Sequence, residues 1–197
     1  MPDRPVWIIE PHADDAWLSL GQHIIGWRVD DRHVTIVTVY GDEQRSREAR
    51  DYAAATGSAH VALGVPEGGQ GLSGVWMTEL PSGVLDAALR AAAAADAVVV
   101  VPLGLRHPEH RAVAAEFARA WSTAAWKLTR HLYVELPYAL TQANGSELRE
   151  AVRGRRVESM AVRSAAANAA APIFRSQSMF WRNNRERMVG AMEVVLS

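Results

Sequence analysis

Apolar and polar positions follow two different periods along the chain. Short runs of consecutive apolar residues are typical of strands that are buried on both faces of a sheet. Between them, apolar residues recur every three or four positions, as they do on one face of a helix. The predicted strands are residues 6–10, 33–40, 60–65, 97–102, 131–137 and 157–163. The predicted helices are 14–30, 45–56, 78–95, 108–126, 164–171 and 183–196, with a glycine-rich loop at 66–76.

Strands and helices that alternate in this way predict an α/β fold. We expect a Rossmann-like, open, mostly parallel sheet with helices on both faces. The chain has 197 residues and shows no repeat or linker, so one domain over residues 1–197 is expected. In such folds, ligands bind beyond the carboxyl ends of the strands, near the point where the strand order reverses.

Composition and charge exclude several classes of protein. Hydrophobic residues make up 49% and charged residues 22%, which is typical of a soluble globular protein rather than a disordered one. The net charge of −1 creates no general attraction to nucleic acid or to an anionic membrane. The apolar stretch 88–105 is interrupted by Arg90, Asp96 and Pro102, so we expect no membrane span. The N-terminus does not resemble a signal peptide, and a cytoplasmic location is therefore expected.

The first predicted strand is followed by a crowded group of ionisable side chains. Residues 7–15 read WIIEPHADD, which places His12, Asp14 and Asp15 within four positions of one another. Such a group is costly to bury unless solvent, a helix N-terminus or a metal ion compensates for it. The chain contains no cysteine, so a metal ion would have to be held by His, Asp or Glu.

A second group of candidate ligands follows the strand predicted at 97–102. His107 and His110 lie three positions apart where a helix begins, behind Pro108 at a tolerated first-turn position. In a doubly wound sheet this strand and the first one are neighbours at the reversal of strand order, so the two groups are expected to meet. Two imidazoles and one carboxylate suit Zn²⁺, and the same donors can hold Fe²⁺ or another divalent ion.

In such a site, two further ionisable groups would not bind the metal ion and could take part in catalysis. Asp14 is then free to take a proton from a water molecule that the metal ion has made more acidic. His107 is then free to protonate a leaving nitrogen or to stabilise an oxyanion. Together these groups predict a metal-assisted amide hydrolase.

Each motif also has a simpler explanation when it is taken alone. Asp14 and Asp15 can cap a helix and interact with the positive end of its dipole. A pair such as His107 and His110 is more often found at the surface than on a metal ion. The joint occurrence of both motifs at the carboxyl ends of predicted strands favours the metal site. The remaining histidines have no such partners and are expected at the surface or at a sheet edge; they are His23, His33, His60 and His131.

The two motifs together resemble those of a known enzyme family. PHADDAWLSLG is similar to the PHPDD-E-x-x-x-G opening of the PIG-L/LmbE-like de-N-acetylases, and HPEH is similar to their HPDH motif. The similarity extends over most of the chain, through TVYGDE (38–43), Arg45-x-x-Glu48, LGVPEGG (63–69) and RSQ (175–177).

This resemblance implies a fold, a reaction and a set of roles. It implies an LmbE-like deacetylase fold and a zinc-dependent hydrolase that removes an N-acyl group, such as acetyl, from an amino sugar or a conjugate. The implied zinc ligands are His12, Asp15 and His110. Asp14 would be the general base, and His107 would be the acid or the oxyanion-stabilising group. Glu109 would lie behind His107 and tune its pKa.

Several positions depart from the family pattern. Ala13 replaces a proline, and Leu105 stands where some members carry an oxyanion-binding tyrosine. Phe174 stands where a His or Tyr often precedes x-S-Q. These changes keep the implied metal ligands and leave open the acyl group, the leaving group and the source of an oxyanion donor.

The residues expected to contact substrate carry a weaker signal. Arg45 could hold a sugar hydroxyl or a phosphate, Glu67 could bind a hydroxyl, and Trp76 could stack on a sugar ring. Their simpler explanations are a solvent-facing arginine, a turn residue and a packing tryptophan. Trp17 is expected to face the core.

Two other functions and the assembly state stay open. The chain could hydrolyse another small-molecule amide, such as a thiol conjugate, or bind a metal ion or a sugar without catalysis. A homo-oligomer is compatible with the sequence. A nucleotide-binding site is disfavoured because no G-x-G-x-x-G follows the first strand.

Overall fold

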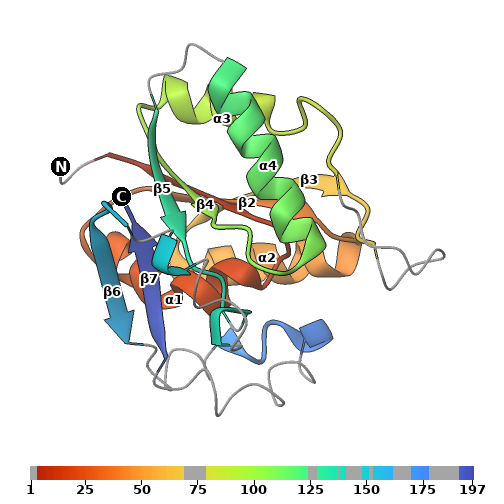
Figure 1. The fold of residues 1–197 in the computed structure, drawn as a ribbon. Coiled ribbons are helices and arrows are strands. Elements are labelled where there is room, and N and C mark those ends of the chain that lie inside the picture. Colours follow the sequence, from red (N-terminus) through yellow and green to blue (C-terminus); the bar gives the residue numbers. More distant parts are fainter. Residues whose placement is uncertain are drawn as a thin grey trace.

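A mixed sheet forms the centre of the structure and has helices on both faces (Figure 1). The structure is a computed structural model that describes residues 4–68, 79–123, 128–136, 138–140, 148–150, 153–161, 170–177 and 191–197. The strands are β1 (Val6–Glu10), β2 (Val34–Tyr40), β3 (Ala59–Val65), β4 (Val98–Pro102), β5 (Thr129–Tyr133), β6 (Val157–Ala161) and β7 (Met192–Leu196). The helices are α1 (Asp15–Val29), α2 (Glu43–Thr56), α3 (Asp86–Ala94) and α4 (Pro108–Thr123), with 3-10 turns η1 (Tyr138–Leu140) and η3 (Arg175–Gln177).

The strand order confirms the predicted α/β fold. The seven strands are arranged as β3-β2-β1-β4-β5-β7-β6. Strands β1 to β5 run parallel to one another, whereas β7 pairs antiparallel with both β5 and β6. The chain builds outward from β1 to β3 and then returns to place β4 on the other side of β1. The order therefore reverses between β1 and β4, where the sequence predicts a ligand site.

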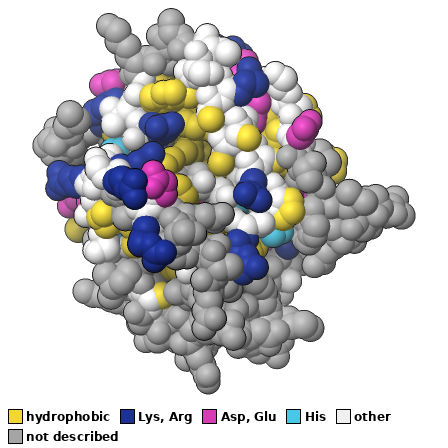
Figure 2. Space-filling view, viewed as in Figure 1, with side chains coloured by type: hydrophobic (Ala, Val, Ile, Leu, Met, Phe, Trp, Pro, Cys, Tyr) yellow, Lys and Arg dark blue, Asp and Glu magenta, His cyan; other side chains and the backbone are white. Residues whose placement is uncertain are grey.

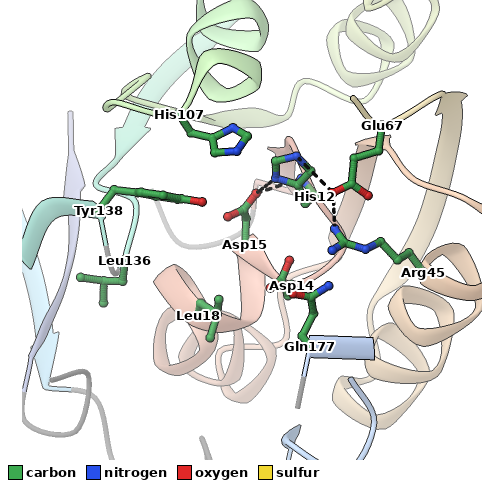
Figure 3. A pocket seen from close by; sticks show the side chains of 10 residues that line it. All are labelled: His12, Asp14, Asp15, Leu18, Arg45, Glu67, His107, Leu136, Tyr138 and Gln177. Carbon is green, nitrogen blue, oxygen red and sulfur yellow. Dashed lines mark hydrogen bonds and ion pairs between the residues drawn. The ribbon is translucent and has the colours of Figure 1, made fainter. Parts of the chain in front are cut away.

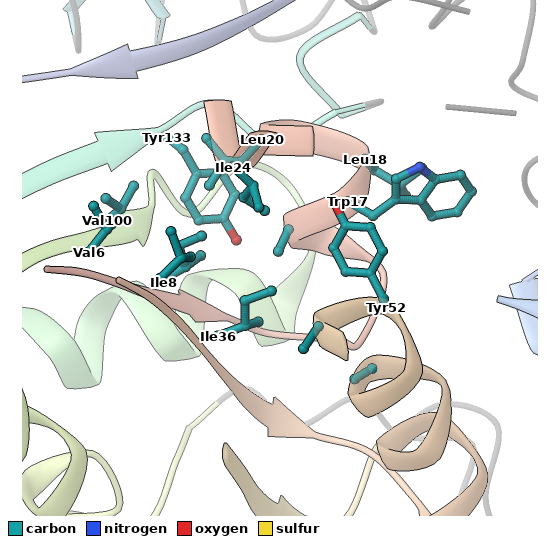
Figure 4. Close-up of a cluster of buried hydrophobic side chains, with 14 of the residues drawn as sticks. Val6, Ile8, Trp17, Leu18, Leu20, Ile24, Ile36, Tyr52, Val100 and Tyr133 are labelled. Atoms are coloured by element: carbon teal, nitrogen blue, oxygen red, sulfur yellow. The ribbon is translucent and has the colours of Figure 1, made fainter. Parts of the chain in front are cut away.

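Each face of the sheet has its own apolar core. Helices α1 and α2 cover one face and α3 and α4 cover the other (Figure 1). Alternate residues of one strand serve opposite faces: Val98 and Val100 pack on the α1 side, while Val99 and Val101 pack on the α4 side. Figure 4 shows the first of these cores, where side chains of β1, β2, β4 and β5 meet those of α1 and α2. A central strand buried on both faces explains the uninterrupted apolar run at 97–102.

The last predicted helix is wrong where the structure describes it. Residues 192–196 form strand β7, which fills the edge left free by β5. A strand there needs a partner that is distant in the sequence, and local periodicity carries no information on that partner. Residues 183–190 lie outside the described part of the chain, as do 164–169 of the other predicted C-terminal helix and 69–76 of the glycine-rich loop.

Two further predictions are wrong: the start of one helix and the exposure of one histidine. The helix predicted from residue 78 begins at Asp86, after turns that contain Pro81 and Gly83, whose φ is +86°. His23, expected at the surface, is 4% exposed, and its Nδ1 lies 3.0 Å from Glu193 Oε2 on β7. Its partner comes from the strand that the sequence pattern did not predict.

The described surface is mixed in character. Basic side chains are interspersed with acidic and apolar ones on the described part of the face shown in Figure 2. Within the described ranges, none of the helices has the length and apolar character that crossing a membrane requires.

Gly104 lies in the turn that leads from β4 to α4, and its backbone demands glycine. Its φ is +87°, and a Cβ atom there would lie 2.9 Å from the Cβ of Ala114. We predict that Gly104→Ala lowers the free energy of unfolding by about 2–5 kcal/mol, from left-handed strain and overpacking together. Gly64→Ala is the matched control, because Gly64 has a φ of +69° but no atom within 4 Å of the added Cβ. Urea unfolding that gives equal losses for the two variants would contradict the close-packing argument.

Candidate functional site

A cavity of about 290 Å³ opens at the carboxyl ends of β1 and β4. Its walls come from the β1–α1 turn, the start of α2, the loop after β3, the β4–α4 loop, the segment after β5, and η3 (Figure 3). Ten side chains line it: His12, Asp14, Asp15, Leu18, Arg45, Glu67, His107, Leu136, Tyr138 and Gln177. The two motifs singled out in the sequence therefore meet in space, at the reversal of strand order.

Three donor atoms at one end of the cavity form a nearly equilateral triangle. Asp15 Oδ2 lies 3.3 Å from His12 Nδ1 and 3.2 Å from His110 Nε2, and these two nitrogens are 3.3 Å apart. Ligand atoms roughly 2.0–2.1 Å from a tetrahedral zinc ion lie about 3.3 Å from one another. The spacing of these buried donors fits a small divalent cation.

His107 lies beside this triangle rather than in it. Its ring centroid is 5.1 Å from those of His12 and His110. Ligand atoms of these three histidines lie within 4.8 Å of one another, so His107 also lies within reach of the same site. A second group within that distance joins His12 to Glu67 and Glu109.

Each imidazole of the triangle has a carboxylate at its other nitrogen. His12 Nε2 lies 2.7 Å from Glu109 Oε2, and His110 Nδ1 lies 3.4 Å from Glu135 Oε1. A carboxylate behind a histidine is the usual way to orient a metal-binding imidazole. Glu109, predicted to lie behind His107 and tune its pKa, bonds to His12; burial lowers the pKa of His107, and the charge of Glu109 partly offsets this.

These outer carboxylates are held in turn by backbone donors. Glu109 Oε1 accepts the N–H of Gly68 at 2.7 Å, and Glu135 Oε1 accepts the N–H groups of Gly104 and Leu105 at 2.8 Å each. Loops after β3, β4 and β5 are thereby tied together behind the histidines. Glu135 was not predicted as a site residue; its signal in the sequence is a single acid at the end of an apolar segment, YVELP.

Helix α1 begins without using the side chain of Asp14 as a cap. Asp14 occupies the N-cap position but makes no capping hydrogen bond. Instead, Glu10 Oε2 accepts the N–H of Ala16 at 2.8 Å, and Asp15 Oδ2 accepts the N–H of His12 at 2.9 Å. The capping explanation thus fails for Asp14, whose carboxylate lines the cavity.

Burial and neighbouring charges give the two adjacent carboxylates, Asp14 and Asp15, different pKa values. Burial, assisted by the charge of Asp15, raises the pKa of Asp14 to about 6. Although burial opposes it, contacts with His110 and His12 hold the pKa of Asp15 well below its usual range. When the pKa values of two neighbouring acids differ widely, the acid with the pKa closer to neutrality is suited to proton transfer.

The pKa values of the three histidines also differ from one another. Against the effect of burial, Asp15 and Glu109 raise the pKa of His12 to about 10, and Asp15 and Glu135 raise that of His110 to about 9. Burial, together with the charges of His110 and His12, lowers the pKa of His107 to about 4. At neutral pH the imidazole of His107 is therefore uncharged.

The opposite wall is built by the R-x-x-E and RSQ segments. Glu48 Oε1 accepts the N–H of Ser176 at 2.9 Å, and the Ser176 hydroxyl donates to Glu48 Oε2. This holds η3 against α2, where the side-chain amide of Gln177 lies against the guanidinium of Arg45. Arg45 also pairs with Glu67 at 3.0 Å and is 15% exposed, so the solvent-facing explanation for Arg45 is wrong.

Other residues of the sequence analysis lie in the core or beyond the described ranges. Trp17 packs in the core as expected, with its ring stacked on Phe174 at 4.9 Å between centroids. Leu105 is buried in an apolar cluster and does not line the cavity. Trp76 lies outside the described residues. Tyr138, which does line the cavity, was not predicted from the sequence.

No family model and no curated protein matches this chain. Solved structures do match, at low sequence identity. A deacetylase of the teicoplanin biosynthesis pathway, in complex with bog, aligns with a TM-score of 0.72 at 19% identity, covering 98% of this chain and 96% of that one. N,N'-diacetylchitobiose deacetylase from Pyrococcus horikoshii aligns with a TM-score of 0.58 at 16% identity, covering 98% and 82%.

The same fold also occurs in an enzyme with another reaction. GalB, the 4-carboxy-2-hydroxymuconate hydratase from Pseudomonas putida, aligns with a TM-score of 0.65 at 12% identity, covering all 100% of this chain and 96% of that one. The comparisons therefore establish the fold seen in these deacetylases. The reaction has to be argued from the side chains of the site.

The Thr38 hydroxyl supports the turn beneath the site. It donates to Glu10 Oε1 at 2.6 Å, inside the protein. Thr38→Val keeps the shape and leaves a buried carboxyl oxygen without this donor, so we predict a loss of about 1–3 kcal/mol in the free energy of unfolding. Thr35→Val on the same strand is the control and is expected to change it by less than about 0.5 kcal/mol. Chemical denaturation that fails to separate the two variants would count against this role of Thr38.

Proposed function

We propose that the protein is a zinc-dependent hydrolase that removes an N-acyl group, such as acetyl, from an amino sugar or an amino-sugar conjugate. The observation that carries the proposal is the triangle of His12, Asp15 and His110, with a carboxylate behind each imidazole and Asp14 beside it in the cavity. Three protein ligands that leave positions open are typical of catalytic rather than structural zinc sites.

The residues of the triangle would hold the metal ion. Bound there, zinc would polarise the acyl carbonyl and make a water molecule more acidic. The outer carboxylates, Glu109 and Glu135, would keep the two imidazoles in the orientation and protonation state that a cation requires. Fe²⁺ and other divalent ions accept the same donors, and zinc is proposed because nitrogen and carboxylate donors in this arrangement suit it.

Asp14 is proposed as the general base. Its raised pKa suits a group that must both accept and release a proton near neutral pH. It takes a proton from water as the water oxygen bonds to the carbonyl carbon. It returns the proton to nitrogen as the C–N bond breaks, so that acetate and a free amine result.

His107 is proposed as a hydrogen-bond donor to the substrate oxygen, and protonation of the leaving nitrogen is its alternative role. Its side chain lines the cavity beside the triangle, and even an uncharged imidazole donates one N–H. Its ring centroid is 5.1 Å from that of His12, within the same cavity.

The remaining walls support a polar, sugar-like substrate. Arg45, Glu67 and Gln177 supply donors and acceptors to one side of the cavity, and the aliphatic side chains among the described lining residues are Leu18 and Leu136. We propose that Arg45 and Glu67 bind substrate hydroxyls. The similarity to a deacetylase of the teicoplanin biosynthesis pathway and to N,N'-diacetylchitobiose deacetylase supports this substrate class over other amides.

Metal binding tests the ligand assignment. We expect purified protein to contain zinc, and we expect His12→Ala, Asp15→Ala and His110→Ala each to lose most of it, because each removes one of three protein ligands. His33→Ala, at an exposed histidine away from the cavity, is the control and should keep its metal. Elemental analysis that finds equal metal in all variants would refute the assignment.

Acetate release tests the reaction and the role of Asp14. We expect Asp14→Asn to keep the metal ion and to lower the rate of acetate release by about 10²–10⁴-fold, because the base is lost. Asp51→Asn, at an exposed acid of α2, is the control. The assay uses a panel of N-acetylated amino sugars, their conjugates and unrelated N-acyl amides.

The outcomes of that panel separate the alternatives. Release from unrelated amides alone would favour a different amidase. A wild-type protein that binds zinc but releases no acetate from any member would favour the non-catalytic alternative. A rate near that of wild type for Asp14→Asn would show that another group is the base.

A further inference from the structure

Tyr138 brings a hydroxyl into the cavity from a part of the chain that carries no recognised motif. It begins η1, which follows β5 after residues 134–137, and Figure 3 shows its hydroxyl directed toward Asp15 and His12. Its ring packs against both histidines, edge-to-face with His110 at 4.9 Å between centroids and tilted against His107 at 5.6 Å. Tyr138 therefore faces the same space as the proposed reacting groups.

The ring is fixed on its other side by the apolar cluster of Leu105, Val134 and Leu196. The turn that presents it is closed by a backbone bond from the N–H of Ala139 to the carbonyl oxygen of Glu135 at 3.0 Å. Glu135 is also the residue that lies behind His110. One short segment thus orients both the histidine and the tyrosine, which keeps their relative positions constant.

The hydroxyl of Tyr138 is protonated at neutral pH, because an ordinary phenol has a pKa of about 10. A neutral phenol can donate a hydrogen bond. The oxygen of a tetrahedral intermediate, on which negative charge develops, would be a strong acceptor for this hydrogen bond.

We propose that Tyr138 donates a hydrogen bond to the carbonyl oxygen of the scissile amide and to the oxyanion that this oxygen becomes, with His107 as a second donor. The inference rests on the proposed function. As the water oxygen bonds to the carbonyl carbon, the electron pair of the C=O double bond moves onto this oxygen, and the water proton goes to Asp14. On collapse the C–N bond breaks, and nitrogen receives its electron pair and the proton from Asp14. Tyr138 keeps its own proton throughout.

The placement of Leu105 agrees with this assignment. Leu105 is 3% exposed and packs in the cluster against which the ring of Tyr138 lies, while its N–H is bonded to Glu135. In this chain the position two residues before His107 supports the tyrosine ring instead of supplying a hydroxyl. The donor comes from the segment after β5, the strand next to β4 in the sheet.

Tyr138→Phe is the decisive variant, because it keeps the ring on the two imidazoles and removes only the hydroxyl. We expect kcat for acetate release to fall by about 10²-fold, the usual effect of losing one oxyanion donor, with KM and zinc content nearly unchanged. Tyr52→Phe is the matched control. Tyr52 is a buried tyrosine of α2 that packs in the core and lies outside the cavity lining, so the loss of its hydroxyl should leave kcat as in wild type.

A binding measurement supplies a readout that does not depend on turnover. Calorimetry with a methylphosphonamidate of glucosamine, which mimics the tetrahedral intermediate, should show weaker binding to Tyr138→Phe by the same factor as kcat/KM. Binding of glucosamine, which lacks the acyl oxygen, should not change.

Each other result overturns the inference in a distinguishable way. An unchanged kcat for Tyr138→Phe would leave the tyrosine a packing residue. A raised KM with an unchanged kcat would make it a substrate-holding residue instead. Either result leaves the proposed function standing. A wild-type protein that releases no acetate from any N-acyl substrate would remove the proposed function and this inference together.

Discussion

One carboxylate oxygen, Oδ2 of Asp15, lies within 3.3 Å of a nitrogen of both His12 and His110, and the rest of the site is organised around this buried contact. It joins the turn after β1 and the start of α1 to the first turn of α4. Charged groups are costly to bury unless they are paired and hydrogen-bonded. Here Glu109 contacts the second nitrogen of His12, and Glu135 contacts that of His110. Backbone N–H groups in turn donate hydrogen bonds to both of these carboxylates.

Two other buried acids, Glu10 and Glu48, make structural hydrogen bonds for which the carboxylate of Asp14 is therefore not needed. Glu10 takes the N–H at the start of α1 that an N-cap aspartate would otherwise accept. Glu48 anchors η3 through Ser176, which brings Gln177 to the wall opposite the histidines. With these tasks assigned elsewhere, the carboxylate of Asp14 lines the cavity with a pKa raised to about 6 by burial and by Asp15. Helix start and candidate chemistry are served by different residues.

Much of the fold and part of the site could be predicted because their signals are local. The alternation of apolar runs and helical periods identified β1 to β5 and α1 to α4 within a few residues, apart from the later start of α3. Strand order then placed the HPEH segment beside PHADD. Strand β7 was missed because its five residues acquire their partners only when β5 offers an open edge. His23 was placed at the surface for the same reason, since Glu193 on β7 is its partner.

The sequence by itself determined the alternating α/β pattern, the lack of thiolate ligands, and the pairing of two motifs rich in His and Asp at the ends of strands. Only the tertiary structure decided which carboxylate meets which histidine, directing Glu109 to His12 and revealing Glu135 behind His110. It also brought Tyr138 over the histidine rings. Periodicity records which face of an element is buried. Contacts between side chains of separate loops depend on strand order and on the path of each turn, which no local pattern encodes.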